Sequence, residues 1–397
     1  MSTVQPLKYI PAFDGVRGLF CILIISHHWI MPYLQGPFAF LWWLLQVFFM
    51  LSAYLITRIL LYDKSRMNFK ALAKRFYTRR ALRIFPLYFA YLIVVGGLLL
   101  LAGTSEAGAN NPEVIYFKQN WGFLFTYTYN FTELVNHFRG IEFHLPPLFS
   151  HLWSLSLEEQ FYFIFPLAIF FLSDKHLKRF ILAFIIGAPI VRLIAFHYLQ
   201  HLDPVNTHWQ GIVTVRNSFF HIDTLAYGVA VAIFDLDKIK KPVILFGILF
   251  VTWLAANLIS AHFIVAAGDA SNIKAALMEP TFMTYHYNYF FNFTLTNIMC
   301  AAFVVTIIKN TAMTKLFVSK PAIYLGKISY GIYIYHLFVM LLTAGLLHAV
   351  LGDLSKFRNN LFAELGIYGV YLCLLVLVAH LSYKYFESYF IKLKDKT

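Results

Sequence analysis

The residues that most clearly suggest chemistry are Arg17 and His28, in the first apolar run of the chain, PAFDGVRGLFCILIISHHW. They lie eleven residues apart. Eleven helical steps of about 100° return to within about 20° of the start, so both side chains share one helix face. At about 1.5 Å per residue, the imidazole lies about 16 Å deeper in a bilayer than the guanidinium. A cation and a titratable base are thus placed along one wall.

Ionisable groups are expensive in lipid and normally face a bundle interior or a wet cavity, so this pair is a candidate site. Asp14, in the same motif, is a supporting candidate. The alternative interpretation is that His27 and His28 simply anchor the helix end at the membrane interface.

A second polar stripe lies in SHLWSLSLEEQFYFIFP, where His151, Ser154, Glu158 and Tyr162 recur at three- and four-residue steps. This spacing places them on one face of an otherwise apolar helix. We expect an interior role for Glu158. The adjacent Glu159 could instead be a solvated charge near the helix N-terminus, favoured by the macrodipole.

The segment GKISYGIYIYHLFV shows the same pattern, with Ser329, Tyr333 and His336 on one side and Tyr330 adjacent. These residues could act in catalysis or serve as interhelical hydrogen-bonding contacts. Asp223, in FFHIDTLAYG, needs a partner or water inside a membrane, but the sequence does not name one.

Three arginines cluster in YTRRALRIFPLY, at positions Arg79, Arg80 and Arg83. Their spacing places them on neighbouring faces of a helix. Clustered guanidiniums suit phosphate oxygens, although a basic loop is also suited to contact with anionic lipid headgroups.

The composition is that of an all-α, polytopic integral membrane protein. The 397 residues are 60% hydrophobic and only 13% charged. Apolar stretches of about 20 residues predict about ten transmembrane helices in a single domain, 1–397. They lie at 16–34, 38–61, 84–103, 150–172, 179–199, 212–234, 242–265, 289–308, 328–348 and 364–391. The three scattered cysteines suggest neither a disulfide framework nor a metal site.

Loop charges predict the orientation. The 62–83 loop is rich in Lys and Arg, whereas the outer loop, about 104–149, carries four glutamates against Lys118 and Arg139. The first loop and both termini are therefore expected in the cytoplasm. The net charge of +13 reflects this bias and not nucleic-acid binding.

Together, PAFDGVRG, RRALRIFPLY, HLWSLSLEEQFYFIFP, HIDTLAYG and KISYGIYIYHLFV resemble the ordered motifs of the membrane-bound acyltransferase-three family, over almost the whole chain. The ending HLSYKYFESYFIK is also similar, although Ser388 and Tyr389 stand where a proline often follows the glutamate. No run after the tenth span is long enough for an appended soluble domain. We therefore expect the stand-alone kind, without a fused SGNH-type domain.

The resemblance implies an enzyme of the bacterial cytoplasmic membrane that takes an acyl group, usually acetyl, from an acyl-coenzyme A donor such as acetyl-CoA. The group is placed on a hydroxyl of a glycan or a lipid-linked glycan precursor, without a metal. A hydroxylated small molecule such as a macrolide, or transfer of succinyl, is the alternative within the family. The oligomeric state is not indicated.

Residue by residue, the resemblance implies that Arg17 and His28 are the essential pair, that Arg80 and Arg83 form the donor-side arginine motif, and that Glu158 belongs to a Trp-Ser-x-x-x-Glu motif. A neutral imidazole can take the proton of a hydroxyl as it attacks a thioester. Glu158, if packed against His28, would orient it. Arg17 would stabilise the oxyanion or hold the donor. A covalent acyl-histidine is equally compatible with these residues.

Two other classes of protein fit the buried polar residues. Ten spans with buried ionisable groups also suit a proton-coupled or solute transporter, although we find no paired repeats with interrupted helices. A structural subunit would use the same stripes only to pack its helices. Dependence on coenzyme A separates a transporter from an acyltransferase.

Overall fold

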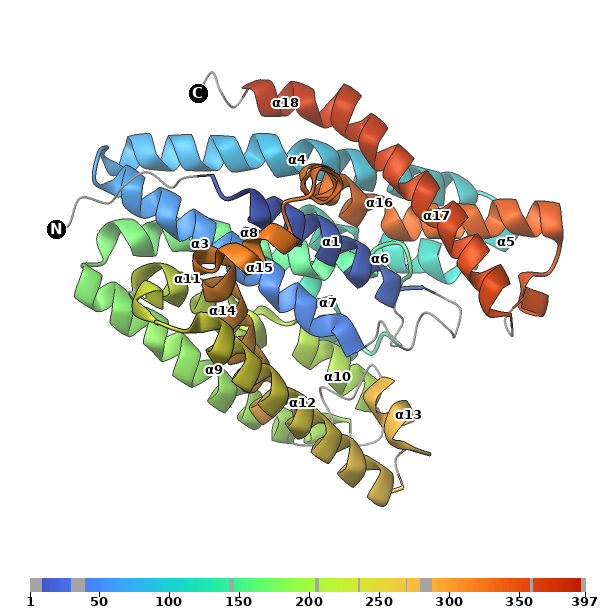
Figure 1. The fold of residues 1–397 in the computed structure, drawn as a ribbon. Helices are drawn as coiled ribbons and strands as arrows, with labels where there is room; N and C mark the ends of the chain where they lie inside the picture. Colours follow the sequence, from blue (N-terminus) through green and yellow to red (C-terminus); the bar gives the residue numbers. More distant parts are fainter. Residues whose placement is uncertain are drawn as a thin grey trace.

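Each apolar run forms a helix in the computed structural model, which describes residues 9–29, 40–142, 146–203, 207–234, 236–268, 270–278, 288–357 and 360–393. The end of the first expected span, 30–34, and the start of the second lie outside these residues. No strand occurs in the described ranges, so the chain is an all-α, polytopic membrane protein (Figure 1).

The long helices are α1 (Pro11–His27), α3 (Leu44–Lys64), α4 (Phe69–Ala102), α8 (Trp153–Phe171), α9 (Asp174–Leu202), α11 (Ser218–Ile233), α12 (Pro242–Ala266), α14 (Asn288–Lys309), α16 (Lys320–Leu351) and α17 (Leu361–Ser382). The shorter helices are α5 (Glu106–Ala109), α6 (Pro112–Phe125), α7 (Thr132–Phe138), α10 (Thr207–Arg216), α13 (Ile273–Met278), α15 (Thr311–Leu316) and α18 (Ser388–Leu393). A π-helical stretch, Tyr383–Glu387, joins α17 to α18.

Seven helices of the described chain are long and apolar enough to cross a membrane: α3, α4, α9, α12, α14, α16 and α17 with its extension into α18. The other three predicted spans correspond to α1, α8 and α11, with 17, 19 and 16 residues. Two of these helices, α1 and α11, are shorter than the 18 residues required of a candidate span.

The basic segment 62–83 is not the loop expected from its charge. Lys64 ends α3, and α4 begins at Phe69, so most of the basic residues occupy the first turns of a 34-residue helix. The Asn68 side chain caps this helix by accepting the Ala71 N–H at 3.0 Å. Lys, Arg and Ala are good helix formers, so the helix continues through the charged sequence. The outer segment 104–149 is also largely helical, in α5, α6 and α7.

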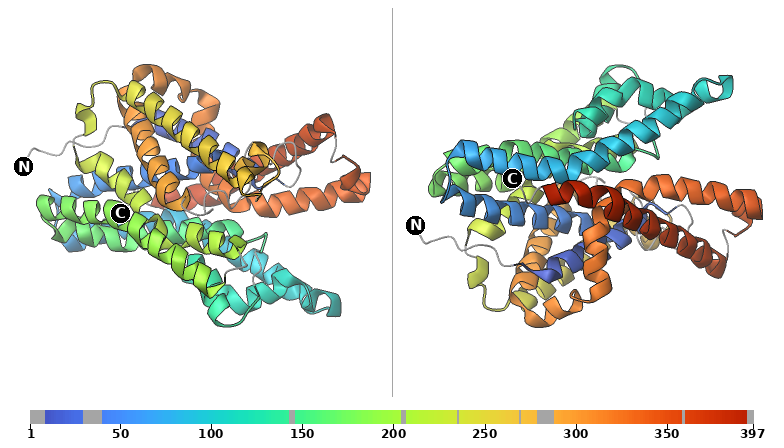
Figure 2. Two further views of the ribbon diagram at one scale, coloured as in Figure 1. Left: turned by 90° about the horizontal axis from the view of Figure 1, so that it is seen from below. Right: turned by 90° about the horizontal axis from the view of Figure 1, so that it is seen from above.

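With the first loop in the cytoplasm, the order of the predicted spans puts the turn between the fourth and fifth spans on the same side, and these two turns lie together. The α3–α4 and α8–α9 turns are both at the left end of Figure 1, opposite α5 and the α16–α17 hairpin. The Lys64 ammonium donates to the carbonyls of Ile169 and Leu172 at 2.7 and 2.9 Å, which joins the two turns. Figure 2 shows α5 and the α16–α17 hairpin at the same end of the molecule, where they diverge from each other.

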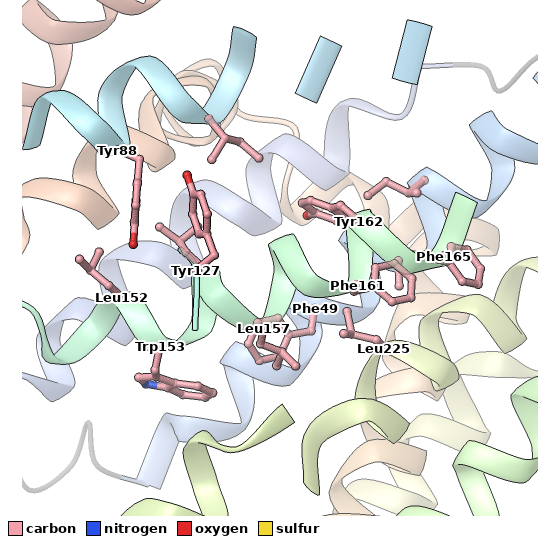
Figure 3. Packing of buried hydrophobic residues seen from close by; sticks show 14 of the residues in the cluster. Phe49, Tyr88, Tyr127, Leu152, Trp153, Leu157, Phe161, Tyr162, Phe165 and Leu225 are labelled. Carbon is pink, nitrogen blue, oxygen red and sulfur yellow. The ribbon is translucent and has the colours of Figure 1, made fainter. Parts of the chain in front are cut away.

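Apolar residues fill the interior and also cover the outside. Phe49, Leu157, Phe161 and Leu225 belong to a buried cluster along α8 (Figure 3). On α12, by contrast, Phe263 is 68% exposed. An exposed apolar helix face of this kind is what a lipid environment requires.

Candidate active site

A cavity of about 460 Å³ lies among α1, α3, α4, α8 and α16. Its lining residues on α3 run from Leu45 to Asp63, so it extends for about 27 Å along that helix at 1.5 Å per residue. The polar residues that line it are Asp14, Arg17, Cys21, Ser52, Asp63, Arg75, Arg79, Arg80, Arg83, Ser154, Glu158, Tyr162, Ser329, Tyr330 and Tyr333. Most of the candidate residues from the sequence therefore meet in one elongated space.

Arg17 is held by its own helix. Pro11 starts α1 at a position where proline is favoured, and Arg17 follows on the face that lines the cavity. The nearest guanidinium nitrogen lies 3.9 Å from the Asp14 carboxylate. That carboxylate also accepts the Tyr9 hydroxyl at 2.6 Å. Asp14 therefore supports Arg17 without enclosing it, and both side chains remain partly exposed.

Four arginines of α4 line the same cavity. Arg75 was not selected from the sequence, because the basic surroundings gave it no distinguishing spacing; it forms an ion pair with Asp63 at 2.9 Å. Arg80 stacks over the ring of Tyr162, 5.1 Å from its centroid. Arg79 and Arg83 line the cavity beside them. With Arg17, this end of the cavity is strongly cationic.

The polar stripe of α8 faces this cavity, as helical periodicity predicts. Ser154, Glu158 and Tyr162 all line it, and the Tyr162 hydroxyl donates to Glu158 at 3.0 Å. His151 lies one turn before α8, in the short 3₁₀ segment Ser150–Leu152. Sequence reasoning placed His151 on the stripe but gave it no role.

The polar residues of α16 form the opposite wall. Tyr330 donates its hydroxyl to the Ile84 carbonyl at 2.8 Å, and Ser329 donates to the Gly326 carbonyl at 2.9 Å. The Tyr333 and Ser154 hydroxyls share a hydrogen bond of 2.6 Å, and Tyr333 also hydrogen-bonds the His151 carbonyl. These two hydroxyls join α8 to α16 at the cavity.

Cys21 also faces the cavity, although the sequence suggested only packing. Its position follows from the spacing, because four residues after Arg17 is the same helix face. Its thiol contacts the Ser329 carbonyl at 3.6 Å.

His28 lies beyond the end of this cavity. The last α1 residue in the lining is Ile24, one turn earlier. The His28 ring lies 5.2 Å from that of His336 and 5.4 Å from that of His27, between ring centroids. Arg17 and His28 are therefore separated along α1 by the roughly 16 Å that their spacing predicts.

Within the described chain no hydrogen bond joins Glu158 to His28, so the structure lends no support to the expectation that Glu158 orients His28. Glu158 bonds Tyr162, and it lines the cavity together with Arg17. His28 is eleven residues further along α1 than Arg17, which is about 16 Å along the helix axis. The ring next to His28 is that of His336.

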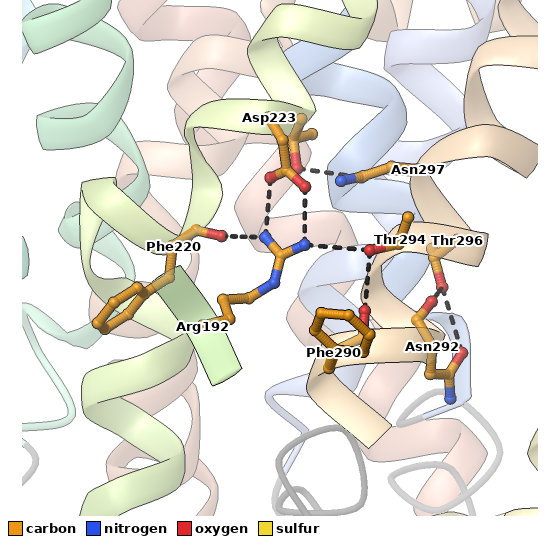
Figure 4. A network of polar contacts seen from close by, with 9 residues as sticks. Arg192, Phe220, Asp223, Phe290, Asn292, Thr294, Thr296 and Asn297 are labelled. Atoms are coloured by element: carbon orange, nitrogen blue, oxygen red, sulfur yellow. Dashed lines mark hydrogen bonds and ion pairs between the residues drawn. The ribbon is translucent and has the colours of Figure 1, made fainter. Parts of the chain in front are cut away.

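Asp223 lies outside the cavity, where its partner is Arg192. Two hydrogen bonds, of 2.9 and 2.8 Å, join the guanidinium to both carboxylate oxygens, and both side chains are fully buried (Figure 4). Arg192 also donates to the Phe220 carbonyl at 2.5 Å and to the Thr294 hydroxyl at 3.3 Å. Asp223 thus belongs to a contact among α9, α11 and α14. The sequence could not show this partner, because the two residues are 31 positions apart.

Among the described residues, no three His, Cys, Asp or Glu side chains are arranged to hold a metal ion. The cavity instead offers guanidiniums at one end, hydroxyls further in, and imidazoles one turn beyond. Such a set can bind anionic groups, polarise a carbonyl and move a proton.

Comparison with known proteins agrees with the motif pattern. The family described as an acyltransferase domain matches residues 10–384. The peptidoglycan O-acetyltransferase OatA of Listeria monocytogenes is 26% identical over 423 residues, covering 100% of this chain and 59% of that protein. The O-acetyltransferase OatA of Staphylococcus aureus strain NCTC 8325 is 25% identical over 392 residues, covering 96% of this chain and 57% of that protein.

The chain thus spans less than two thirds of the length of these relatives. No solved structure gives a significant match. Because the family match covers nearly the whole sequence, including every helix that lines the cavity, the chain belongs to the membrane-bound acyltransferase-three family.

Proposed function

We propose that this protein is a membrane O-acyltransferase of the bacterial cytoplasmic membrane. It moves an acyl group, acetyl in the main proposal, from cytoplasmic acyl-coenzyme A to a hydroxyl of a cell-surface glycan or its lipid-linked precursor. The observation that carries this proposal is one elongated cavity, cationic at one end and lined with hydroxyls further in.

The cationic end suits the phosphates of coenzyme A. Arg79, Arg80 and Arg83 line it from α4, and Arg17 lines it from α1. Guanidiniums bind phosphate oxygens through charge-assisted, often bidentate hydrogen bonds. Loop charges favour the cytoplasm for this end, and acyl-coenzyme A is available there.

The length of the cavity suits the rest of the donor. Coenzyme A carries its phosphates at one end and its thioester at the end of a long flexible arm. A cavity extending about 27 Å along α3 accommodates an extended arm, with the thioester directed towards Ser154, Tyr333 and His28.

In the proposed reaction, neutral His28 takes the proton of the acceptor hydroxyl as its oxygen attacks the thioester carbonyl. The tetrahedral oxyanion then collapses, the carbon–sulfur bond breaks, and the protonated imidazole returns the proton to the departing thiolate. Arg17 holds the acyl-coenzyme A on its approach to His28. A group that donates a hydrogen bond at that end of the cavity stabilises the oxyanion. The direct route and an acyl-histidine route differ in whether acyl-enzyme accumulates without acceptor.

The acceptor is proposed from the relatives. One of them is named a peptidoglycan O-acetyltransferase, which favours a cell-wall glycan over a macrolide. The proposal includes acetyl rather than succinyl for the same reason.

The test measures transfer of labelled acetyl from acetyl-coenzyme A into the glycan and lipid fractions of membranes. Wild type and His28→Ala are compared at equal amounts of folded protein, with His348→Ala, an exposed position on α16, as the control. Label with wild type and the control, but not with His28→Ala, supports the proposal. Equal label in all three contradicts the role of His28, and solute movement without coenzyme A would favour a transporter.

A further inference from the structure

Three imidazoles lie close together one turn beyond the end of the cavity that is remote from the arginines. His28 comes from the end of α1, His151 from the segment before α8, and His336 from α16. The His336 ring centroid lies 5.2 Å from that of His28 and 4.7 Å from that of His151. His336 is therefore the central ring of the three.

The tautomer of His336 is fixed by its own helix. Its Nδ1 lies 2.6 Å from the Tyr333 carbonyl oxygen. A carbonyl only accepts hydrogen bonds, so Nδ1 must carry the proton. In the neutral ring, Nε2 is then an acceptor.

That acceptor is buried and lacks a hydrogen-bond partner among the described residues. His336 itself is 0% exposed. Buried polar atoms are normally paired, so an unpaired one requires an explanation. The three rings do not form a metal-ligand set within the described chain, which leaves a proton donor as the missing partner.

His28 is one of two rings that can supply this donor. Its ring lies within 5.2 Å of His336, and rotation about its side-chain bonds can direct a ring N–H at the free nitrogen. The other is His151, which is only 2% exposed and whose ring centroid lies 4.7 Å from that of His336, so the tautomer of His28 decides which of the two rings donates.

We propose that His336 is the positioning residue for His28. Its Nε2 accepts the N–H of His28, so the other nitrogen of His28 keeps its lone pair and faces the acceptor hydroxyl. His336 thereby does what the sequence suggested for Glu158. This inference rests on the proposed function for its chemistry, but the hydrogen bond itself can be tested without turnover.

The variants are His336→Ala and His336→Gln, with His348→Ala on the same helix as the control. The glutamine amide oxygen can accept the His28 N–H, whereas alanine cannot. We expect His336→Ala to lower kcat at least 100-fold, with the KM for acetyl-coenzyme A within twofold of wild type. The kcat of His336→Gln should be at least tenfold higher than that of His336→Ala.

Spectra of protein with ¹⁵N-labelled histidine provide a readout that packing alone would not change. The His28 signal, assigned by its loss in His28→Asn, should report one tautomer in wild type and a mixture in His336→Ala. Equal activity in His336→Ala and wild type would overturn the proposal, as would equal loss in the alanine and glutamine variants. If His336→Ala does not fold, mixed tautomers of His28 in wild type would still overturn it. Absence of any transfer by wild type would instead contradict the proposed function.

Discussion

Gly326 of α16 lies directly against the backbone of Asp14 of α1. A Cβ atom at position 326 would lie 1.9 Å from the Asp14 carbonyl oxygen and 2.5 Å from its carbonyl carbon. Gly18 on α1 has the reciprocal contact, since its Cβ would lie 2.3 Å from the Ala322 carbonyl oxygen. These close approaches hold α1 against α16, and so they set where Arg17 and His28 lie relative to Tyr333 and His336.

We therefore expect Gly326→Ala to disturb both stability and activity. Backbone atoms cannot move aside as a flexible side chain can, and overpacking of this kind costs about 1–3 kcal/mol. The temperature of thermal unfolding in detergent should fall, and the rate of acetyl transfer per folded molecule should fall as well. Gly345→Ala is the control, because nothing lies within 4 Å of a Cβ at that position of the same helix. Equal behaviour of the two variants would contradict the close contact.

Removing one arginine of the cationic end should weaken donor binding. In Arg83→Ala, the loss of one charge-assisted phosphate contact of about 1.5–3 kcal/mol corresponds to a roughly 10- to 100-fold rise in KM for acetyl-coenzyme A. The effect should shrink at high salt, where the wild-type contact is itself weaker. Initial rates over a range of donor concentrations measure both.

Arg66→Ala is the matched control for Arg83→Ala. Arg66 belongs to the same basic segment but stacks over Tyr62, 4.1 Å from its ring centroid, outside the cavity. A similar rise in KM for both variants would mean that general positive charge, and not the cavity, attracts the donor.

Breaking the Arg192–Asp223 pair should reduce stability more than catalysis. In Asp223→Asn the fully buried guanidinium loses its counter-charge, and removal of one partner of a buried pair costs about 3–5 kcal/mol. The double variant Arg192→Met with Asp223→Leu removes both charges and should be more stable than Asp223→Asn. Unfolding of each variant in detergent provides the comparison, with the exposed Asp353→Asn as control.

Activity per folded molecule should remain near wild type in Asp223→Asn, since neither Arg192 nor Asp223 lines the cavity. A large loss of kcat in a well-folded Asp223→Asn protein would instead show that Asp223 contributes to catalysis.

Helical periodicity accounts for the part of the site that the sequence could predict. The spacings within α1 and α8 assign Arg17, Ser154 and Glu158 to particular faces, and these faces line the cavity. The same spacing places His28 at a different depth from Arg17. Periodicity within one helix therefore predicts both which side chains share a wall and how far apart they lie.

The neighbours of each helix could not be predicted in this way. Nothing in the spacing of α8 shows that Glu158 lies at the depth of Arg17, or that His336 is the ring beside His28. The partner of Asp223 was missed for the same reason, because it comes from a different helix. Such contacts depend on how helices pack laterally, and a single sequence carries no direct record of that.

The outer segment should give the protein a pH-dependent stability through Glu113, near the start of α6. Burial raises the pKa of this carboxyl from its ordinary 4.5 to about 7, against a smaller opposing effect of the Leu148 backbone hydrogen bond. Between these two pH values the folded state holds a proton that the unfolded state has lost. Stability from this group is therefore complete below about pH 4.5 and is lost as the pH rises through 7.

Glu113→Gln keeps the neutral form at every pH, so it should remove this part of the pH dependence. We expect the melting temperature of the variant to be close to that of wild type at pH 5 and higher than that of wild type at pH 8. At pH 8 only the wild type has to bury a charged carboxylate. Glu106→Gln, at an exposed position of α5, is the matched control and should follow wild type at both pH values. Parallel melting curves for wild type and Glu113→Gln from pH 5 to 8 would show that Glu113 titrates as it does in the unfolded chain.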